Sequence, residues 1–321
     1  VYRSYHNQVN LNRLSNRDSI VMASYHLGTA EFDKDLENLI LEKTEGIPFF
    51  IEEFLKCLKE LEIIQIIGHK CYLRKDISPV MISSTIQDVI LARVDKLNSG
   101  PKKVLQACSV IEREFTYELI KKVTGMPEPE LLTHLSILKD SELLYERGIY
   151  PESTYIFKHT LTREVIYDSI LAKRKKDLHA IVGNAIENIN RENISEHYGV
   201  LVEHFIKSGD FEKGAEYSKL VSKKAAKMAS LNVAIAYARK RVESLENLDR
   251  TDYVIKNIIN ARTALGLYNS QFGYIEEAKE AIAPIMDITL RHGNKRRLSQ
   301  IYIIDGAYSY MIEENFQRAF K

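Results

Sequence analysis

The chain has 321 residues, of which 28% are charged and 45% hydrophobic, and its net charge is +1. This length allows two or three domains with sizeable cores, and the near-zero charge gives no general attraction to nucleic acid or to an anionic membrane. No apolar run approaches the ~18 residues that a membrane span needs, and no charged-then-apolar signal peptide opens the sequence. We therefore expect a cytoplasmic protein without a membrane partner.

Cysteine usage points to a reducing compartment. The three cysteines, Cys57, Cys71 and Cys108, are odd in number and widely separated, which predicts unpaired thiols. His69 and Cys71 could in principle ligate a metal, but one pair lacks the four ligands of a structural zinc site. A turn followed by a strand is the interpretation that we favour there, and we expect no metal site.

The first segment gives the start of a helix but no catalytic core. Residues 9–14 alternate apolar and polar side chains, as a short strand does, and Ser15 with Asp18 resembles a capping box for a helix through Tyr25. No G-x-x-x-x-G-K-[ST] motif occurs, and no apolar strand ends in paired acids, so we expect no ATP hydrolysis from this stretch. The sequence starts without Met and stops at Lys321 inside a predicted helix, which is typical of a fragment.

Residues 33–62 predict two amphipathic helices that meet at a sharp corner. Gly46 can take the left-handed conformation past a helix end, and Pro48 suits the first turn of the next helix. Free N–H groups and a rigid proline ring at such a corner could face an anion or a flat ring. An ordinary helix–helix corner is the alternative.

The second of these helices carries an apolar stripe and two adjacent acids. The stripe predicts a core face, and it comprises Phe50, Phe54, Leu58 and Leu61. Glu52, Glu53 and Lys56 are expected to be solvated. Paired acids could serve acid/base chemistry, but neighbours on a helix point apart, so this interpretation is disfavoured.

The middle of the chain predicts a hairpin and then a winged helix. Residues 63–75 fit a β-hairpin around Gly68 and His69, and Ser83 or Ser84 is expected to cap a helix through Leu97. Helices over 104–111, 117–123 and 128–138, followed by two short strands, make a winged helix with a small hairpin. The third helix region is acidic, with Glu128, Glu130, Asp140 and Glu142 against a single Lys139, which makes DNA an unlikely partner.

The C-terminal third predicts helical repeats. A basic cluster at 173–176 opens a long helix with Leu178, Ile181, Val182, Ala185, Ile186 and Ile189 on one side. Residues 208–217, 272–281 and 314–320 then repeat a turn, an aromatic and a small residue, which resembles degenerate tetratricopeptide repeats. Stacked helix pairs of this kind offer a surface for protein or peptide partners.

Three stretches in order resemble one family. TEGIPFFIEEFL (44–55), STIQDVILARVDKL (84–97) and YIFKHTLTREVIYDSIL (155–171) are similar to segments of bacterial STAND-type signalling ATPases, which are often fused to nucleotide cyclase or protein kinase domains. The first matches the family's Gly-Asn-Pro-Phe-Phe-x-Glu-Glu segment and departs from it at Ile47, where the family usually has Asn.

The resemblance implies a fold and a regulatory role. It implies a mainly α chain. Its parts are the end of an ATPase core with the first lid helix (1–32), a helical lid with a hairpin (33–82), a winged helix (83–171), a connecting helix (172–194) and TPR-like repeats (195–321). ATP or ADP, with Mg²⁺, would be held by a P-loop core absent from this sequence. Gly46 and Pro48 would lie near the adenine, and His159 would contact the ADP phosphate in the closed state.

Other interpretations of the same residues stay open. From the sequence alone, His159 also fits a buried or capping histidine at a strand–helix junction. The whole chain could instead be a winged-helix DNA-binding regulator, for which a basic third helix would be the distinguishing feature, or a protein-interaction scaffold without a nucleotide role. In the STAND interpretation the segment itself is not an enzyme, and the intact protein would be an ATPase.

Overall fold

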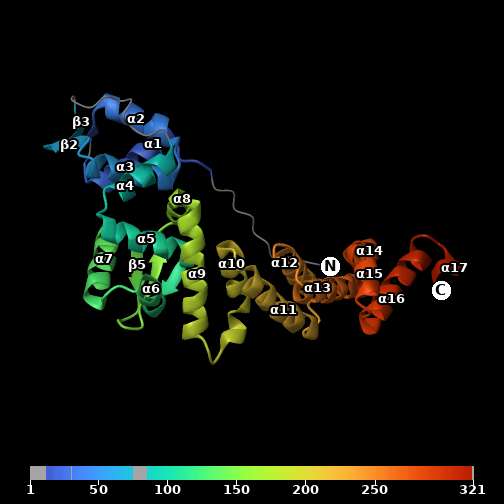
Figure 1. Ribbon diagram of the computed structural model, residues 1–321. Coiled ribbons are helices and arrows are strands. Elements are labelled where there is room, and N and C mark those ends of the chain that lie inside the picture. Colours follow the sequence, from blue (N-terminus) through green and yellow to red (C-terminus); the bar gives the residue numbers. More distant parts are fainter. Residues whose placement is uncertain (1–11, 30, 75–84, 320–321) are drawn as a thin grey trace, which may run out of the picture. The chain divides into compact units, whose positions relative to one another are not determined.

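The computed structural model describes residues 12–29, 31–74 and 85–319. The fold is mainly α, as expected, and the chain divides into two compact units (Figure 1). The first unit contains the described residues up to Phe115 together with Met126–Ile170, and the second contains Thr116–Gly125 and Leu171 onward. In the described part, no helix combines the length and the apolar character needed to cross a bilayer.

The N-terminal half of the first unit is a helical cluster with a small sheet at its edge. Its helices are α1 (Asn16–Leu27), α2 (Lys34–Thr44), α3 (Pro48–Glu60) and α4 (Ile86–Asp95). Its strands are β1 (Glu31–Phe32), β2 (Ile64–Ile67) and β3 (Lys70–Leu73). β2 and β3 form the predicted hairpin, and β1 adds a parallel pairing to β3 that the sequence did not predict. α3 lies in the centre of the core, where Ile51, Phe54 and Leu58 are almost fully buried.

The predictions for the first strand and for the cap of α4 fall wholly or partly outside the described residues. Residues 9–11 of the predicted first strand lie outside the described residues, and 12–14 form no strand. Ser15 caps α1 as expected, because its hydroxyl accepts a bond of 3.1 Å from the backbone of Asp18. Ser83 and Ser84 also lie outside the described residues, and the cap of α4 is Thr85, whose hydroxyl accepts from the Asp88 backbone N–H.

The remainder of the first unit combines helices with a second three-stranded sheet. The helices are α5 (Ser99–Ile111), α7 (Glu128–Asp140) and α8 (Thr160–Ser169). The strands are β4 (Glu114–Thr116), β5 (Leu144–Arg147) and β6 (Thr154–Phe157), in the order β4-β6-β5. β5 and β6 form the predicted antiparallel hairpin, whereas β4 was not predicted. The short α6 (Tyr117–Thr124) packs on α9 and belongs to the second unit.

The second unit is a succession of helices. They are α9 (Ala172–Ile189), α10 (Tyr198–Ser208), α11 (Phe211–Lys227), α12 (Leu231–Glu246), α13 (Asp252–Phe272), α14 (Ile275–Ile282), α15 (Met286–Arg291), α16 (Lys295–Met311) and α17 (Phe316–Ala319), with short 3-10 turns at Ile194–Glu196 and Ala283–Ile285. From α9 to α14 each helix packs on the next (Figure 1). This nearest-neighbour packing is what TPR-like repeats require.

Glycines mark two of the predicted repeat turns. Gly209 ends α10 with φ 88° and Gly273 ends α13 with φ 91°, a conformation that side chains rarely adopt. The predicted core side of α9 is confirmed at Leu178, Val182 and Ala185, but Ile181 is 37% exposed. The repeat motifs therefore lie at helix–helix turns, where a short connection lets the next helix fold back.

Candidate functional site

The Gly46–Pro48 corner has the predicted geometry. α2 ends at Thr44, Gly46 has φ 72°, and Pro48 occupies the first turn of α3. The carbonyl of Gly46 accepts a 2.8 Å bond from the backbone N–H of Leu14, and a Cβ on Gly46 would lie 2.4 Å from the Leu14 carbonyl oxygen. Glycine is therefore required here by backbone conformation and by the close approach of the preceding segment.

His159 lies against the first turn of α3. Its ring centroid is 4.0 Å from that of Phe49, with the planes tilted by 36°. The residues beside Phe49 in the corner, Ile47 and Pro48, are exposed, whereas Gly46 is buried. His159 occupies the N-cap position of α8, its side chain is 28% exposed, and it makes no capping bond. The structure thus brings the corner and His159 together, although they are far apart in the sequence.

The imidazole of His159 has an unused polar atom. Its Nε2 has no hydrogen-bond partner among the described residues, and it lies 3.9 Å from Oε2 of Glu52. Burial lowers the pKa of His159, against the opposing effect of the nearby carboxylates of Glu52 and Glu53. The ring is therefore neutral near pH 7, with one nitrogen able to donate and the other able to accept.

Beside His159, two acids and two lysines form a half-buried network. Nζ of Lys56 lies 2.7 Å from Glu52, Nζ of Lys158 lies 2.8 Å from Glu142, and Lys158 also bonds Glu52 and Lys56 also bonds Glu142. Burial raises the pKa of Glu52, but the bonds from Lys158 and Lys56 outweigh it and lower the pKa to about 2. The bonds from the same lysines lower the pKa of Glu142 to about 2.

Glu53 makes a fully buried ion pair with Arg93 of α4 and also lies 3.9 Å from Nζ of Lys56. The side chains are 2% and 3% exposed, and the same guanidinium bonds Glu60 at 3.2 Å and donates 2.8 Å to the carbonyl of Ser141. Burial lowers the pKa of Arg93, but Glu53 and Glu60 outweigh it, so the pKa is raised. The prediction that Glu52, Glu53 and Lys56 are solvated was therefore wrong.

These charges join elements that are distant in sequence. α3 contributes Glu52, Glu53 and Lys56; α4 contributes Arg93; the segment after α7 contributes Ser141 and Glu142; and the β6–α8 junction contributes Lys158. We call this set the junction network. The junction network spans the helical cluster and the second sheet region of the first unit.

Three side chains of metal-ligating type lie close together at the junction network. One ligand atom each from Glu52, Glu53 and His159 lies within 4.8 Å of the others. The two carboxylates already bond Lys56, Lys158 and Arg93, which neutralise them. A divalent cation would have to compete with three fixed cations, so the arrangement fits an ion-pair cluster.

The thiols and the pair of His69 and Cys71 agree with the structural interpretation. All three cysteines are free and buried, and burial raises the pKa of Cys57 to about 11. Cys71 is fully buried on β3, whereas His69 is exposed in the hairpin turn. Such thiols are poor nucleophiles and poor metal ligands.

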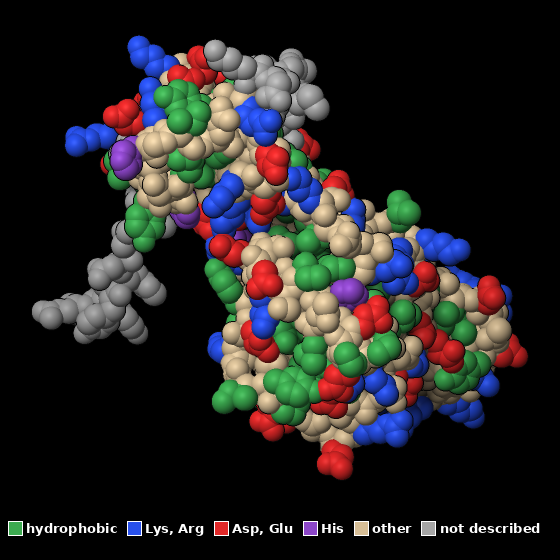
Figure 2. Space-filling model, turned by 90° about the vertical axis from the view of Figure 1, so that its left-hand side faces the viewer, with side chains coloured by type: hydrophobic (Ala, Val, Ile, Leu, Met, Phe, Trp, Pro, Cys, Tyr) green, Lys and Arg blue, Asp and Glu red, His purple; other side chains and the backbone are tan. Residues whose placement is uncertain are grey.

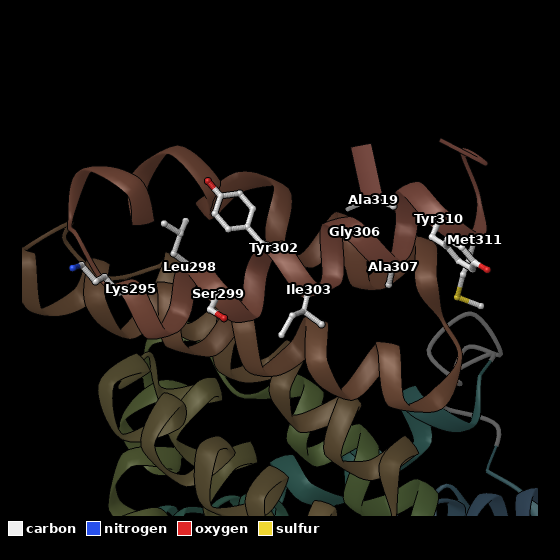
Figure 3. Close-up of a pocket in the computed structure, with 10 residues that line it drawn as sticks. All are labelled: Lys295, Leu298, Ser299, Tyr302, Ile303, Gly306, Ala307, Tyr310, Met311 and Ala319. Carbon is white, nitrogen blue, oxygen red and sulfur yellow. The ribbon is translucent and has the colours of Figure 1, made fainter. Parts of the chain in front are cut away.

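An open, largely apolar cavity lies in the second unit. It has a volume of about 850 Å³, and its lining side chains come from α16, apart from Ala319 of α17 (Figure 3). Tyr302, Ile303 and Met311 are among them and are more than half exposed. Most of this lining is apolar, and Lys295, Ser299 and the hydroxyls of Tyr302 and Tyr310 are its polar groups.

Comparisons with known proteins name no activity for the chain. A family model described as "Domain of unknown function (DUF8739)" matches residues 15–71, which run from the cap of α1 to β3 and include the corner. An uncharacterized protein of Rhizobium meliloti (strain 1021) is 21% identical over 222 residues, which are 69% of this chain and 21% of that protein. The chain thus spans about a fifth of the length of that relative.

One solved structure is similar along most of the chain. It is a Signal Transduction ATPase with Numerous Domains (STAND) protein with a tetratricopeptide repeat sensor, from Pyrococcus horikoshii. The match covers 97% of this chain and 59% of that one, with 12% identity and a TM-score of 0.36. The two proteins are distant in both sequence and superposition, and this match assigns no function to the present chain.

Proposed function

We propose that this chain is a regulatory segment of a STAND-type signalling ATPase and that it closes over ATP or ADP held by a P-loop core elsewhere in the same protein. The observation that carries the proposal is the contact between Phe49 and His159. Two of the three motifs that resemble the family contribute those residues, and they meet beside the exposed ring of Pro48.

The residues at this place fit a nucleotide. Ile47 and Pro48 offer an exposed, rigid apolar face for a purine. Nε2 of His159 is buried without a hydrogen-bond partner in the described residues, and it would donate to a phosphate once the site opens to the ligand. Gly46 is buried against Leu14, so its part is to set the conformation of the corner rather than to touch the base. The bound nucleotide and its Mg²⁺ would bring the phosphate chemistry, and this chain would orient and cover it.

The junction network supplies a means to relay the nucleotide state. A phosphate near His159 would add negative charge close to Glu52 and Lys158, whose ion pairs link α3 to the segment after α7. Gain or loss of that charge would favour different arrangements of α3 relative to α7 and α8, which is a population shift. The controlled output would be a linked domain such as a nucleotide cyclase or kinase.

The remaining parts of the proposal concern the middle and end of the chain. α5, α6, α7 and the β5–β6 hairpin follow the order of a winged helix, which we assign as an internal packing module. Figure 2 shows Lys and Arg mixed with Asp and Glu over the visible face, so no extended basic area appears on it for a duplex. The helices from α9 onward would bind protein or peptide partners.

Photo-crosslinking tests the nucleotide contact directly. The full-length protein is irradiated with an azido-adenine analogue of ADP, digested, and the labelled peptides are identified by mass spectrometry. We expect label on the peptide that contains Ile47–Phe49, with protection by excess ADP. Label confined to other peptides, with none at the corner, would contradict the proposal that this segment closes over the nucleotide. The exposed hairpin around His69 serves as the internal control for non-specific labelling.

A further inference from the structure

A buried arginine on α12 lacks any partner among the described residues. Arg241 is only 8% exposed, and no hydrogen bond or ion pair of its guanidinium occurs in the described part of the chain. Burial lowers the pKa of Arg241 to about 10, with Arg297 adding to the effect, and the opposing effect comes from Tyr268 and Tyr253 rather than from a carboxylate. A buried charge without a counterion is costly, so this arginine calls for an explanation.

Arg241 lies in a cavity between α11, α12 and α13. The cavity has a volume of about 400 Å³. A second cation, Lys219 of α11, shares its lining, and burial together with Arg241 lowers the pKa of that lysine. Lys219 likewise makes no ion pair in the described chain. Two cations without an ion-pair partner that line one cavity favour the binding of an anion there.

The acids of this cavity lie at its exposed edge. Glu212, Glu216 and Asp249 are all exposed, whereas Arg241 is buried. None of the three pairs with Arg241, because no ion pair of this arginine occurs in the residues that the structure describes. The cavity therefore has a cationic interior and an acidic edge, and Leu245, Leu248 and Val254 contribute apolar lining.

We propose that this cavity, between α11 and α13, binds the carboxylate of a small organic acid and that Arg241 is the residue that recognises it. A guanidinium presents two parallel N–H donors that match a carboxylate, and pairing in a buried place would compensate the charge that the protein leaves unpaired.

The acidic edge narrows the class of ligand. Three exposed carboxylates repel a multiply charged anion such as a nucleotide or inorganic phosphate, whereas an ammonium group would be attracted to them. An amino acid, with one carboxylate and one ammonium, thus fits the charge pattern better than a simple fatty acid or a phosphate. The proposal concerns the second unit alone and does not depend on a nucleotide role for the first.

Calorimetric titration of the 321-residue chain tests the proposal. The probes are acetate, succinate, a panel of L-amino acids and inorganic phosphate, at constant ionic strength and pH 7. We expect saturable binding of at least one carboxylate, with amino acids bound more tightly than acetate. Phosphate binding more tightly than every carboxylate, or no carboxylate binding up to about 10 mM, would overturn the proposal.

Two variants separate recognition from folding. Arg241→Met should weaken carboxylate binding at least about tenfold, since it removes a bidentate charged bond. Arg239→Met, an exposed arginine of the same helix, should leave the affinity unchanged. The free Arg241→Met protein should melt no lower than the wild type, because it loses an uncompensated charge. A lower melting temperature, or equal affinity in both variants, would show instead that Arg241 is structural.

Discussion

The two units each contain a buried arginine, and the two arginines differ in whether the chain supplies a counterion. Arg93 is 4% exposed, and its guanidinium bonds Glu53, Glu60 and the Ser141 carbonyl. Arg241 is 8% exposed and has no partner in the described residues. Carboxylates raise the pKa of the first, whereas burial and Arg297 lower that of the second. Similar burial therefore does not mean a similar role.

This difference distinguishes the junction network, which is an internal contact, from the α11–α13 cavity, which we propose as a binding site. In the junction network every buried charge has a counterion within the chain, so its energy is used to hold α3, α4 and the segment after α7 together. In the α11–α13 cavity the counterion has to come from outside. The first arrangement is complete within the chain, whereas the second needs an anion to balance its charge.

Glu53→Gln should have the largest effect on this contrast. It leaves the buried Arg93 with only Glu60 and the Ser141 carbonyl, so we expect a loss of about 3 kcal/mol in the free energy of unfolding. Urea unfolding followed by circular dichroism measures it. Glu62→Gln, whose side chain is 84% exposed, is the control and should change little. Equal effects of the two variants would mean that the buried pair contributes nothing special.

The pH dependence of Glu52 sharpens the same contrast. Its pKa is lowered from 4.5 to about 2, so the stability that it contributes is complete above pH 4.5 and is lost as the pH falls toward 2. We expect Glu52→Gln to cost about 2 kcal/mol at pH 7 and almost nothing near pH 2. The exposed Glu42 offers a control as Glu42→Gln. A cost that stays constant between pH 7 and pH 2 would contradict the ion-pair assignment.

Two glycines allow a similar comparison of steric room around the backbone. Gly46→Ala meets both a positive φ and the Leu14 carbonyl at 2.4 Å, whereas Gly28→Ala meets a positive φ with nothing within 4 Å. Both should lose about 1 kcal/mol from conformation, and Gly46→Ala should lose clearly more because the Leu14 segment has to move. Thermal unfolding of the two variants measures the difference. Equal losses would show that the segment before α1 adapts freely to the corner.

An exposed arginine should show the smallest effect. Arg147 pairs with Glu114, but its side chain is 70% exposed. We expect Arg147→Ala to change the free energy of unfolding by about 0.5 kcal/mol or less, since water screens the pair. The same urea titration gives the value. A loss as large as that of Glu53→Gln would show that burial is not what distinguishes the junction network.

The sequence predicted the secondary structure better than it predicted the burial and pairing of the charged side chains. Helix ends at Gly46 and Pro48, the β2–β3 hairpin and the β5–β6 hairpin were confirmed, because glycine, proline and alternating residues act locally. Strands β1 and β4 were missed, since two or three residues carry no detectable period. The predicted roles of Gly46, Pro48 and His159 toward a nucleotide stay predictions.

The buried charges were missed although the sequence held a signal. Glu53 is one turn from Phe50 and Cys57, Arg93 is between Ile90 and Val94, and Arg241 follows Ala238 by three residues, so each lies on an apolar helix stripe. A charged residue on such a stripe indicates either a buried partner or a ligand. Which of the two applies depends on contacts between distant segments, and spacing within one helix cannot supply them.

The rate at which ADP leaves the full-length protein measures most directly whether the first unit closes over a nucleotide. A stopped-flow chase of fluorescent ADP compares His159→Ala with His69→Ala, which alters an exposed histidine of the β2–β3 turn. We predict faster release in His159→Ala alone, by about tenfold for the loss of one hydrogen bond to a charged phosphate. Release at the wild-type rate in both variants would contradict a nucleotide contact at His159.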